Sequence, residues 1–380
     1  MKIGVDAYYL YAEHIDGLGN FLLRLLVQLS RIDSGNEYFL YAPGVRHRAQ
    51  ADIIFSNPHF HLCEIRGLAS GKRRIWLQSP SLRSAIIRDG IEFFFAGAEY
   101  FPLFIPRYIK VATAIHDVAF KAIPAAISLT NSIFYNVLFP FFVKRADYFF
   151  TVSDHSKKEM VNYLHINPEK ITVVYNGIDL SEFTPAATYE KEPYLLFVGT
   201  LQPRKNLVNI IRAFALIADR IQESLVVVGG SGWKNSPLAD LVEGLEKPVR
   251  DRIVFKGYVD GEELSRLFRR ARLFVLPSLH EGFCLPILEA IASGTAVLTA
   301  WSTAIPEVFG DAVEYADPLD PEDIAEKLYE LVSDGRKRAR LEERGLAHSK
   351  KYDVKTQAAG YLAAFNSIAA AVRAGQKGTS

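Results

Sequence analysis

The stretch ARLFVLPSLHEGFCLPILEA, residues 271–290, carries the pattern that decides the fold. Its first part, ARLFVLPSL, is an apolar run with the length and composition of a buried strand. Further along, Pro286 suits the first position of a helix, where a missing N–H costs nothing and φ is already suitable. The stretch therefore predicts a strand, a loop and a helix, the repeating unit of a parallel α/β sheet.

Two acids flank that loop. Glu281 is predicted on the loop above the carboxyl end of the strand, and Glu289 one turn into the helix. Eight helical steps would separate them by about 12 Å along the axis, so they are no acid/base pair. The backbone N–H groups of residues 283–285 lead into the positive end of the helix, which favours an anion. The loop is therefore predicted to bind a phosphate flanked by polyols, whose hydroxyls the carboxylates suit.

Strand-like runs alternate with helical patterns over almost the whole chain. The runs are KIGVDAY, EYFLYAP, HLCEI, EFFFAG, KVATAIHD, DYFFTVS and KITVVYNG, then LLFVGT, SLVVVGG, RIVFKGY, LFVLPS and AVLTA. Between the two groups, the polar segment 184–193 is the best linker candidate. Since 380 residues exceed one typical domain, we predict two doubly wound, Rossmann-like α/β domains facing a cleft, at residues 1–184 and 185–355. A last helix, at about residues 356–375, can pack across either domain and is assigned to the first.

Composition excludes several classes of protein. With 44 basic and 43 acidic residues, the chain lacks the basic excess of a protein that binds nucleic acid through bulk charge. Cys63 and Cys284 are isolated, and neither has a neighbouring Cys or His at zinc-ligand spacing, which indicates reduced thiols in a cytoplasmic protein and no zinc site. There is no Gly-x-Ser-x-Gly elbow, no Gly-Lys-Ser/Thr phosphate loop and no Asp-x-Asp pair. We therefore expect no metal and no cofactor.

No apolar stretch reaches the roughly 18 to 20 residues that a membrane span requires. The nearest is IFYNVLFPFFV, residues 133–143, which is read as a buried helix, with a helix at a membrane interface as the alternative. A second segment, residues 71–87, mixes the basic residues 72–74 with Trp76 and Leu77. It has the composition of an interfacial segment or of a solvated face beside a core helix.

A second strand-to-helix junction lies in FVGTLQPRKNLVNIIRAFALIADRI, residues 197–221. Apolar residues recur there with helical spacing from Leu207 to Ile221, and Asn206 is placed to cap this helix. Arg204 and Lys205 then project beside free N–H groups. From this stretch alone, the two residues are interpreted as solvated loop cations. The second junction, at residues 280–290, reverses that interpretation, because two strand-to-helix junctions of one sheet can converge on one diphosphate.

Two further candidates lie in the first half of the chain. Gly17 and Gly19, in HIDGLGNFLLRLLVQL, let the backbone approach a ligand closely. Leu22 stands where a dinucleotide fingerprint needs its third glycine, which argues against NAD. His116 ends the strand KVATAIHD, beside Asp117. It is either a satisfied structural histidine or a ligand for a substrate hydroxyl.

The order of DGLGN, AIHD, TVSDHSKKE, VVYNGID, FVGTLQPRKN and HEGFCLPILEAIASGTAVLT resembles that of the retaining glycosyltransferases with a GT-B fold, in the large family typified by bacterial mannosyltransferases. The resemblance covers about residues 3–350. It implies metal-independent transfer of a sugar from a nucleotide sugar to an acceptor hydroxyl, with the anomeric configuration kept. Many members have a fuller Gly-Gly-x-Gly loop, and here Asp16 replaces the first glycine, which puts the acceptor side of that loop in doubt.

The resemblance also implies roles for single residues. The acid at Glu281 contacts the donor sugar, together with the main-chain N–H groups of nearby residues, namely Gly282, Phe283, Cys284 and Leu285. Glu289 binds the ribose hydroxyls, and the pair Arg204 and Lys205 holds the diphosphate. His116 bonds a donor hydroxyl near the reacting carbon. Gly17 and Gly19 form the loop near the phosphates and the acceptor.

The compact GTLQPRKN form resembles enzymes that use GDP-mannose in surface polysaccharide assembly, so mannose is the leading expectation. A UDP-sugar donor, glucose or N-acetylglucosamine, stays open with the same chemistry. So do a nucleotide-sugar epimerase and a noncatalytic sugar-nucleotide-binding protein. A lipid-linked glycan acceptor would suit the basic-aromatic segment 72–77, and would place the protein peripherally at the inner face of the cytoplasmic membrane.

Overall fold

The structure is a computed structural model that describes residues 1–13, 17–66, 72–123, 132–185, 191–230, 237–259 and 261–377. By their contacts, these residues form two compact units. The first holds the described residues within 1–118, 128–176 and 354–380, and the second those within 119–127 and 177–353. The domain boundary at residue 184 stays a prediction, because part of the segment 184–193 lies outside the described residues.

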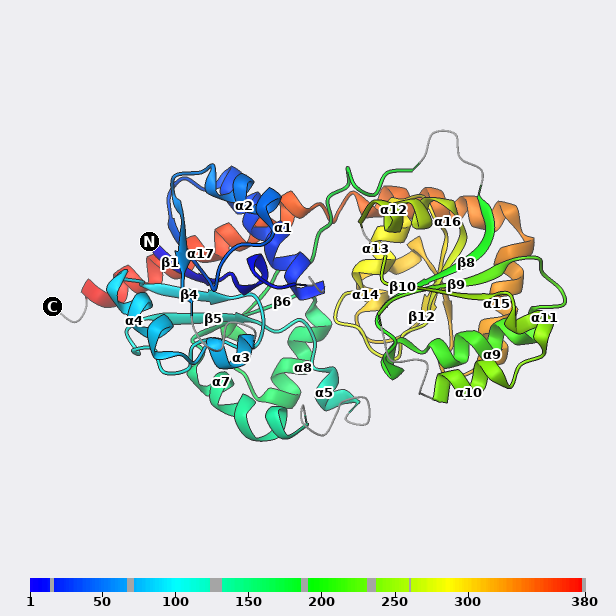
Figure 1. The fold of residues 1–380 in the computed structure, drawn as a ribbon, viewed down its shortest axis with the longest axis horizontal. Helices are drawn as coiled ribbons and strands as arrows, with labels where there is room; N and C mark the ends of the chain where they lie inside the picture. The colour runs from blue at the N-terminus through cyan, green and yellow to red at the C-terminus, as the bar shows by residue number, and fades with distance from the viewer. Residues whose placement is uncertain are drawn as a thin grey trace. The chain divides into compact units, whose positions relative to one another are not determined.

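The first unit is built on a seven-stranded sheet in the order β3-β2-β1-β4-β5-β6-β7 (Figure 1). All neighbouring strands pair in parallel, as the alternation of strand and helix patterns predicts. The strands are β1 (Lys2–Asp6), β2 (Glu37–Ala42), β3 (Phe60–Glu64), β4 (Phe93–Ala96), β5 (Lys110–Ala114), β6 (Tyr148–Thr151) and β7 (Ile171–Val173). Each of these strands falls within a run that the sequence marks as strand-like, except that β3 begins one residue before its run, at Phe60.

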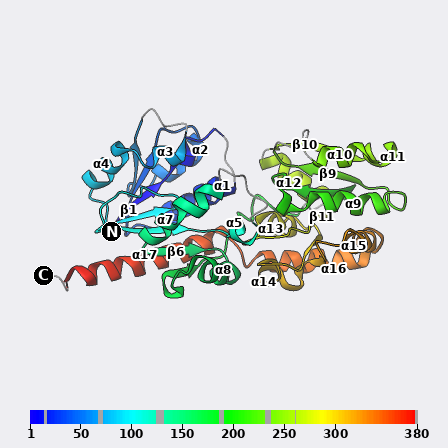
Figure 2. The same cartoon turned by 90° about the horizontal axis from the view of Figure 1, so that it is seen from below.

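Helices pack on both faces of this sheet. They are α1 (Gly17–Ile32), α2 (Arg48–Phe55), α3 (Arg73–Trp76), α4 (Pro80–Arg88), α7 (Phe139–Arg145), α8 (Asp154–Leu164) and α17 (Val354–Lys377). A π-helical segment, η3 (Phe134–Leu138), leads directly into α7, and short 3₁₀ turns lie at η1 (Tyr8–Leu10) and η4 (Pro168–Lys170). Figure 2 shows α17 extending along the first unit.

Helices α1 and α17 contribute to one hydrophobic core. Along α1, Leu22, Leu25, Leu26 and Leu29 recur at helical spacing and are all buried. From α17, the ring of Phe365 lies 5.5 Å from that of Phe93, 5.2 Å from Phe95 and 5.8 Å from Phe150. The last helix is therefore an integral part of the first unit and not a surface appendage.

The second unit has a six-stranded parallel sheet in the order β10-β9-β8-β11-β12-β13. Its strands are β8 (Glu192–Val198), β9 (Ser224–Val228), β10 (Ile253–Gly257), β11 (Ala271–Leu276), β12 (Val297–Ala300) and β13 (Glu314–Ala316). Its helices are α5 (Ala119–Ala122), α9 (Leu207–Ile217), α10 (Pro237–Glu243), α11 (Lys247–Arg250), α12 (Gly261–Arg270), α13 (Leu285–Ala292), α14 (Ile305–Phe309), α15 (Pro321–Ser333) and α16 (Gly335–Ser349), with 3₁₀ turns η5 (Pro203–Lys205) and η7 (Gly310–Ala312). Strand β13 was not predicted, because its three residues form no apolar run.

The strand order determines where each unit can bind a ligand. In the second sheet β8 lies between β9 and β11, so the connections leaving β8 and β11 run in opposite directions. In the first sheet β1 lies between β2 and β4 in the same way. Ligands of such sheets bind at the carboxyl ends of the strands at this switch point. The loops after β8 and β11 therefore lie side by side, at the edge where a ligand is expected.

The apolar segment 133–143 is buried on one side of its helix and exposed on the other, whereas the sequence predicts a fully buried helix. Phe134, Phe139 and Phe142 are buried, whereas Val137 and Phe141 on the other side are more than half exposed. Pro140 has no N–H to donate to the carbonyl of the residue four before it, and the preceding turn is widened to the π form. The expectation of a buried helix is therefore wrong for one face.

The segment 72–77 differs from an interfacial anchor. Trp76 and Leu77 are each 1% exposed, and the Trp76 indole donates to the carbonyl of Ile65 at 2.8 Å. The guanidinium of Arg73 pairs with the buried Asp6 at 2.5 Å. The arrangement matches the alternative of a charged face beside a packed helix.

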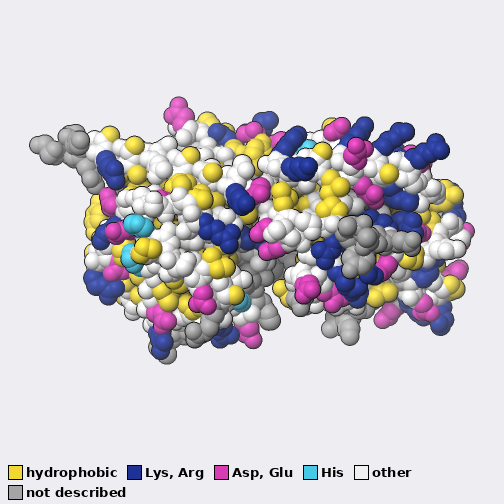
Figure 3. Space-filling view, turned by 90° about the horizontal axis from the view of Figure 1, so that it is seen from above, with side chains coloured by type: hydrophobic (Ala, Val, Ile, Leu, Met, Phe, Trp, Pro, Cys, Tyr) yellow, Lys and Arg dark blue, Asp and Glu magenta, His cyan; other side chains and the backbone are white. Residues whose placement is uncertain are grey.

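The surface carries both signs of charge. On the face in Figure 3, Lys and Arg side chains are interspersed with Asp and Glu. This agrees with the near balance of 44 basic and 43 acidic residues. Among the described residues, the structure has no helix that is both long and apolar enough to cross a bilayer.

Candidate functional site

In the second unit, hydrogen bonds join the loop after β8 to the loop after β11. The N–H of Leu279 donates to the carbonyl of Arg204 at 2.8 Å. The side-chain nitrogen of Asn206 donates to the carbonyls of Pro277, at 3.0 Å, and Pro318, at 2.6 Å. Asn206 does precede α9, but its φ is 63° and its side chain makes no cap bond. The predicted N-cap is therefore wrong, and the residue holds the loops after β8 and β11 together.

Arg204, Lys205 and Glu281 form one ion cluster at this edge. The ammonium of Lys205 lies 2.5 Å from Oε1 of Glu281, and Nη1 of Arg204 lies 3.3 Å from Oε2. Lys205 is 7% exposed and Glu281 4% exposed. Nη1 of Arg204 also donates to the carbonyl of His280 at 3.3 Å. The structure thus brings together the two junctions that the sequence predicts to converge, and it rejects the reading of these cations as solvated.

The cluster keeps Glu281 ionised. Burial by itself raises the pKa of the carboxyl, but the charges of Lys205 and Arg204 and a hydrogen bond from Lys205 outweigh it and lower the pKa to about 2. At neutral pH the side chain can accept hydrogen bonds but has no proton to give. It therefore suits ligand hydroxyls and does not suit the role of a general acid.

This ion pair predicts a pH dependence of stability. Because the pKa of Glu281 falls from 4.5 to about 2 on folding, the unfolded chain takes up the proton first as the pH is lowered. The stabilisation is complete above about pH 4.5 and is lost as the pH falls toward 2. The Tm of Glu281→Gln should lie below that of the wild type at neutral pH, and the difference should shrink over this window in thermal unfolding.

The control is Asp251→Asn. Asp251 pairs with Lys247 at the same 2.5 Å, but the two side chains are 54% and 76% exposed. Exposed pairs contribute little, so this variant should change Tm slightly at every pH. A Glu281→Gln difference that stays constant down to pH 3 would contradict an ionised, buried Glu281.

The segment that follows Glu281 is fixed through its backbone. The N–H of Glu281 donates to Oγ1 of Thr303 at 3.0 Å, and its carbonyl accepts from the N–H of Ala304 at 3.3 Å. Cys284 has a φ of 78° just before α13, and burial raises the pKa of its thiol, so it is no nucleophile at neutral pH. Nothing in the sequence pattern points to Thr303 as a partner of this loop.

Helix α13 presents its amino-terminal end at the same loop. Gly282, Phe283 and Cys284 precede it, and Leu285 is its first residue, so Pro286 occupies the second position and not the first. Glu289 lies in the second turn and is 9% exposed. The positive helix end and the Arg204–Lys205 pair thus belong to two loops that are bonded to each other, an arrangement suited to a phosphate-bearing ligand.

Gly229 allows the strand ends beside this site to approach each other. Its φ is 154°, and a Cβ built there would lie 1.9 Å from the carbonyl oxygen of Gly199. Gly199 follows β8, and Gly229 follows β9. No residue with a side chain fits at position 229 without moving the loop that carries the two cations.

In the first unit, His116 and the start of α1 lie together. Nε2 of His116 bonds the carbonyl of Gly97 at 3.0 Å, and the ring of Phe21 lies 4.6 Å away. Gly17 and Gly19 lie in the first turn of α1, and a Cβ at Gly17 would meet no atom of the described residues within 4 Å. The departure at Asp16 lies outside the described residues.

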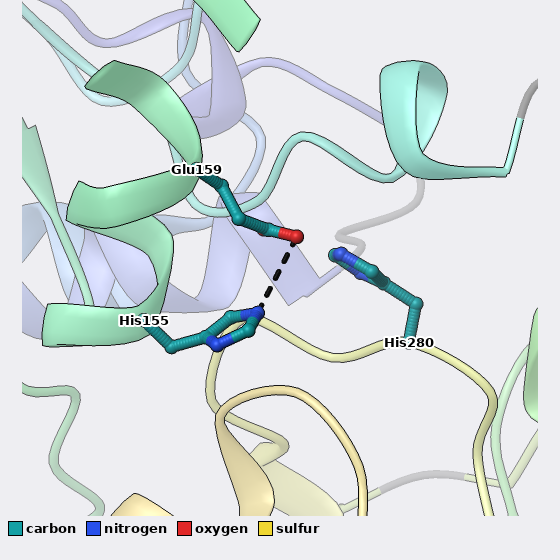
Figure 4. A group of neighbouring side chains, drawn as sticks. All are labelled: His155, Glu159 and His280. Carbon is teal, nitrogen blue, oxygen red and sulfur yellow. Dashed lines mark ion pairs between the residues drawn. The ribbon is translucent and has the colours of Figure 1, made fainter. Parts of the chain in front are cut away.

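The neighbouring Ser153 and His155 form no catalytic pair. Ser153 caps α8, and its hydroxyl accepts from the N–H of Ser156 at 3.1 Å. Nε2 of His155 instead lies 3.3 Å from a carboxylate oxygen of Glu159, one turn along the same helix (Figure 4). Ser153 therefore acts as the N-cap of α8.

Comparison with known proteins identifies the family. Residues 15–182 match Glycosyltransferase Family 4, and residues 181–348 match Glycosyl transferases group 1. O-antigen chain mannosyltransferase B of Escherichia coli is 30% identical over 291 residues, which are 73% of this chain and 74% of that protein. The chain belongs to the group 1 glycosyltransferases. As such it is an enzyme that takes a nucleotide-sugar donor and a glycan acceptor.

Solved structures agree with the fold of this glycosyltransferase. Sucrose-phosphate synthase from Thermosynechococcus elongatus has a TM-score of 0.75 at 18% identity and covers 98% of this chain and 100% of that one. Alr3699/HepE of Anabaena, in complex with UDP and glucose, has a TM-score of 0.72 at 16% identity and covers 97% and 100%. At such identities the likeness shows the fold alone. It confirms the predicted GT-B architecture of two parallel-sheet α/β domains.

Proposed function

We propose that this glycosyltransferase moves mannose from GDP-mannose to a hydroxyl of a glycan acceptor and keeps the anomeric configuration. The observation that carries the proposal is the buried cluster of Arg204, Lys205 and Glu281 at the switch point of the second sheet. The 30% identity with an O-antigen chain mannosyltransferase supports mannose as the sugar. The acceptor is proposed to be a lipid-linked glycan of surface polysaccharide or O-antigen assembly.

The basic pair supplies the electrostatic part of the mechanism. Arg204 and Lys205 hold the donor diphosphate and stabilise it as negative charge develops on the leaving group. Because Glu281 fixes both cations before the donor arrives, little reorganisation is needed during the reaction. Two fixed cations and a helix end can replace a divalent metal, so the transfer is proposed to proceed without metal or cofactor.

The remaining candidates are assigned to the donor and the acceptor. Glu281 accepts hydrogen bonds from hydroxyls of the donor sugar, Glu289 from those of the ribose, and His116 bonds a donor hydroxyl near the reacting carbon. Gly17 and Gly19, in the first turn of α1, lie near the phosphates and the acceptor. The N–H groups at the start of α13 complete the phosphate cradle and belong to Gly282, Phe283, Cys284 and Leu285.

Retention is proposed to follow a front-face route, in which the leaving phosphate takes the proton of the acceptor hydroxyl. A covalent route needs a carboxylate with a free oxygen directed at the anomeric carbon. Both oxygens of Glu281 already bond cations, at 2.5 Å and 3.3 Å, which lowers their nucleophilicity. Its low pKa weakens it further as a base. The electrostatics therefore favour a binding role for Glu281.

The test is isothermal titration of the protein in EDTA with GDP, UDP, ADP and their sugar conjugates. Selective binding of GDP and GDP-mannose is expected, and Asp251→Asn, remote from the cluster in an exposed pair, serves as the matched control. Selective uridine binding would replace the donor by a UDP-sugar such as glucose or N-acetylglucosamine. Donor consumption that needs no added acceptor would instead indicate an epimerase, and a product with inverted configuration would overturn the retaining route.

A further inference from the structure

The helix formed by η3 and α7 exposes an apolar face in the first unit. Ile133 is 63% exposed, Val137 56%, Leu138 50% and Phe141 59%. We call these four residues the α7 face. Single exposed apolar side chains are ordinary, but four within residues 133–141 of one helix exceed that background.

The helix is held in place from its other side, so the exposure is not a sign of loose packing. Phe134, Phe139 and Phe142 are buried, and the rings of Phe134 and Phe142 lie in edge or tilted contact with Tyr100, and that of Phe142 also with Phe101. The turn between these buried residues is the π-helical segment η3. Such π segments occur frequently at functional sites.

A loop bonded to the end of α7 carries two exposed aromatic rings. Nη2 of Arg145 donates to the carbonyls of Pro106, at 3.2 Å, and Ile109, at 3.0 Å, which fixes this loop against the helix end. Phe104 is 69% exposed and Tyr108 67% exposed on the same loop. Exposed aromatic rings beside aliphatic ones are typical of side chains that enter a lipid interface.

Basic residues border this surface near the end of α7. No Asp or Glu occurs between Asp117 and Asp147 in the sequence. Lys144 and Arg107 are exposed near the end of α7. Asp147 is engaged by Lys110 and Arg145. An anionic surface therefore complements the border of the α7 face.

We propose that the α7 face binds the surface of an anionic lipid bilayer. The apolar side chains enter the boundary between head groups and acyl chains, while Lys144 and Arg107 contact lipid phosphates. A second copy of the chain fits less well, because a two-fold interface would bring the same basic border toward itself. The inference rests on the proposed function because the lipid-linked acceptor proposed there would lie at a membrane surface.

The test is sedimentation of the full chain with vesicles of phosphatidylcholine alone and with one third phosphatidylglycerol, without nucleotide sugar. The double variant Leu138→Ser, Phe141→Ser should reduce binding to the anionic vesicles by at least about tenfold. Lys144→Glu changes only an exposed charge and should also weaken binding, more so at low salt. The matched control is Leu216→Ser, Leu319→Ser, at residues that are 51% and 73% exposed in the second unit and should leave binding unchanged.

The outcomes separate this inference from the proposed function. Wild-type binding that the double variant and Lys144→Glu both lose, with unchanged titration of the nucleotide sugar, supports the α7 face whichever donor is found. Failure of the wild type to sediment, or equal binding by all variants, overturns it and leaves the donor assignment untouched. A wild-type dimer that the double variant converts to monomer would assign the face to a second copy and also overturn it.

Discussion

Lys205→Ala is expected to lower kcat/KM for sugar transfer by about 10²–10³-fold, the usual loss when one preorganised charge on a developing anion is removed. The ammonium of Lys205 is buried and fixed 2.5 Å from Glu281, so its position is set before the donor binds. Loss of the charge should weaken donor binding as well as slow the chemical step. Steady-state kinetics and titration of the nucleotide together measure the two effects.

In this variant the buried carboxylate of Glu281 keeps Arg204 as its partner but loses the charge of Lys205. The partly uncompensated negative charge should lower the stability of the protein as well as its activity. The double variant Lys205→Ala, Glu281→Gln removes this charge imbalance and should recover much of the lost Tm without recovering kcat/KM. Lys247→Ala, in an exposed pair with the same 2.5 Å separation, is the control. Near wild-type kcat/KM in folded Lys205→Ala would remove Lys205 from the diphosphate site.

Phe365→Ala is expected to destabilise the first unit by about 3–5 kcal/mol, the usual range for truncation of a buried aromatic side chain. The ring is fully buried and contacts rings from β4 and β6 as well as Tyr361 of its own helix. Truncation of the ring would leave a cavity where α17 packs against the sheet. Chemical denaturation, followed by circular dichroism, measures the loss as an earlier transition.

Tyr163→Ala is the matched control for Phe365, because it also truncates an aromatic residue of the first unit but at a side chain that is 47% exposed. It should change the transition by a fraction of the Phe365 effect. If Phe365→Ala unfolds no earlier than this control, α17 does not contribute to the core as the structure indicates.

Several features of this protein follow from local patterns in the sequence. Short apolar runs are visible in the local sequence, so twelve of the described strands could be predicted. Their parallel pairing could be predicted from the alternation of strand and helix patterns, whereas β13 is too short to form such a run. The helix at 285–292 was recognisable because Pro286 indicates a helix start, although the helix begins one residue earlier, at Leu285. In contrast, Asn206 fits an N-cap by residue type, yet its backbone adopts a left-handed conformation that only the neighbouring loops explain.

By itself, the sequence determined that the chain forms two parallel α/β sheets with cations and acids on strand-to-helix loops, because these patterns depend on residues close together in the chain. Only the tertiary structure decided that β8 and β11 are neighbours, so that Lys205 and Arg204 share the single carboxylate of Glu281. It also decided that α17 completes the first core and that one side of α7 stays exposed. Strand order and burial depend on contacts between distant segments, and the periodicity of a single segment does not contain them.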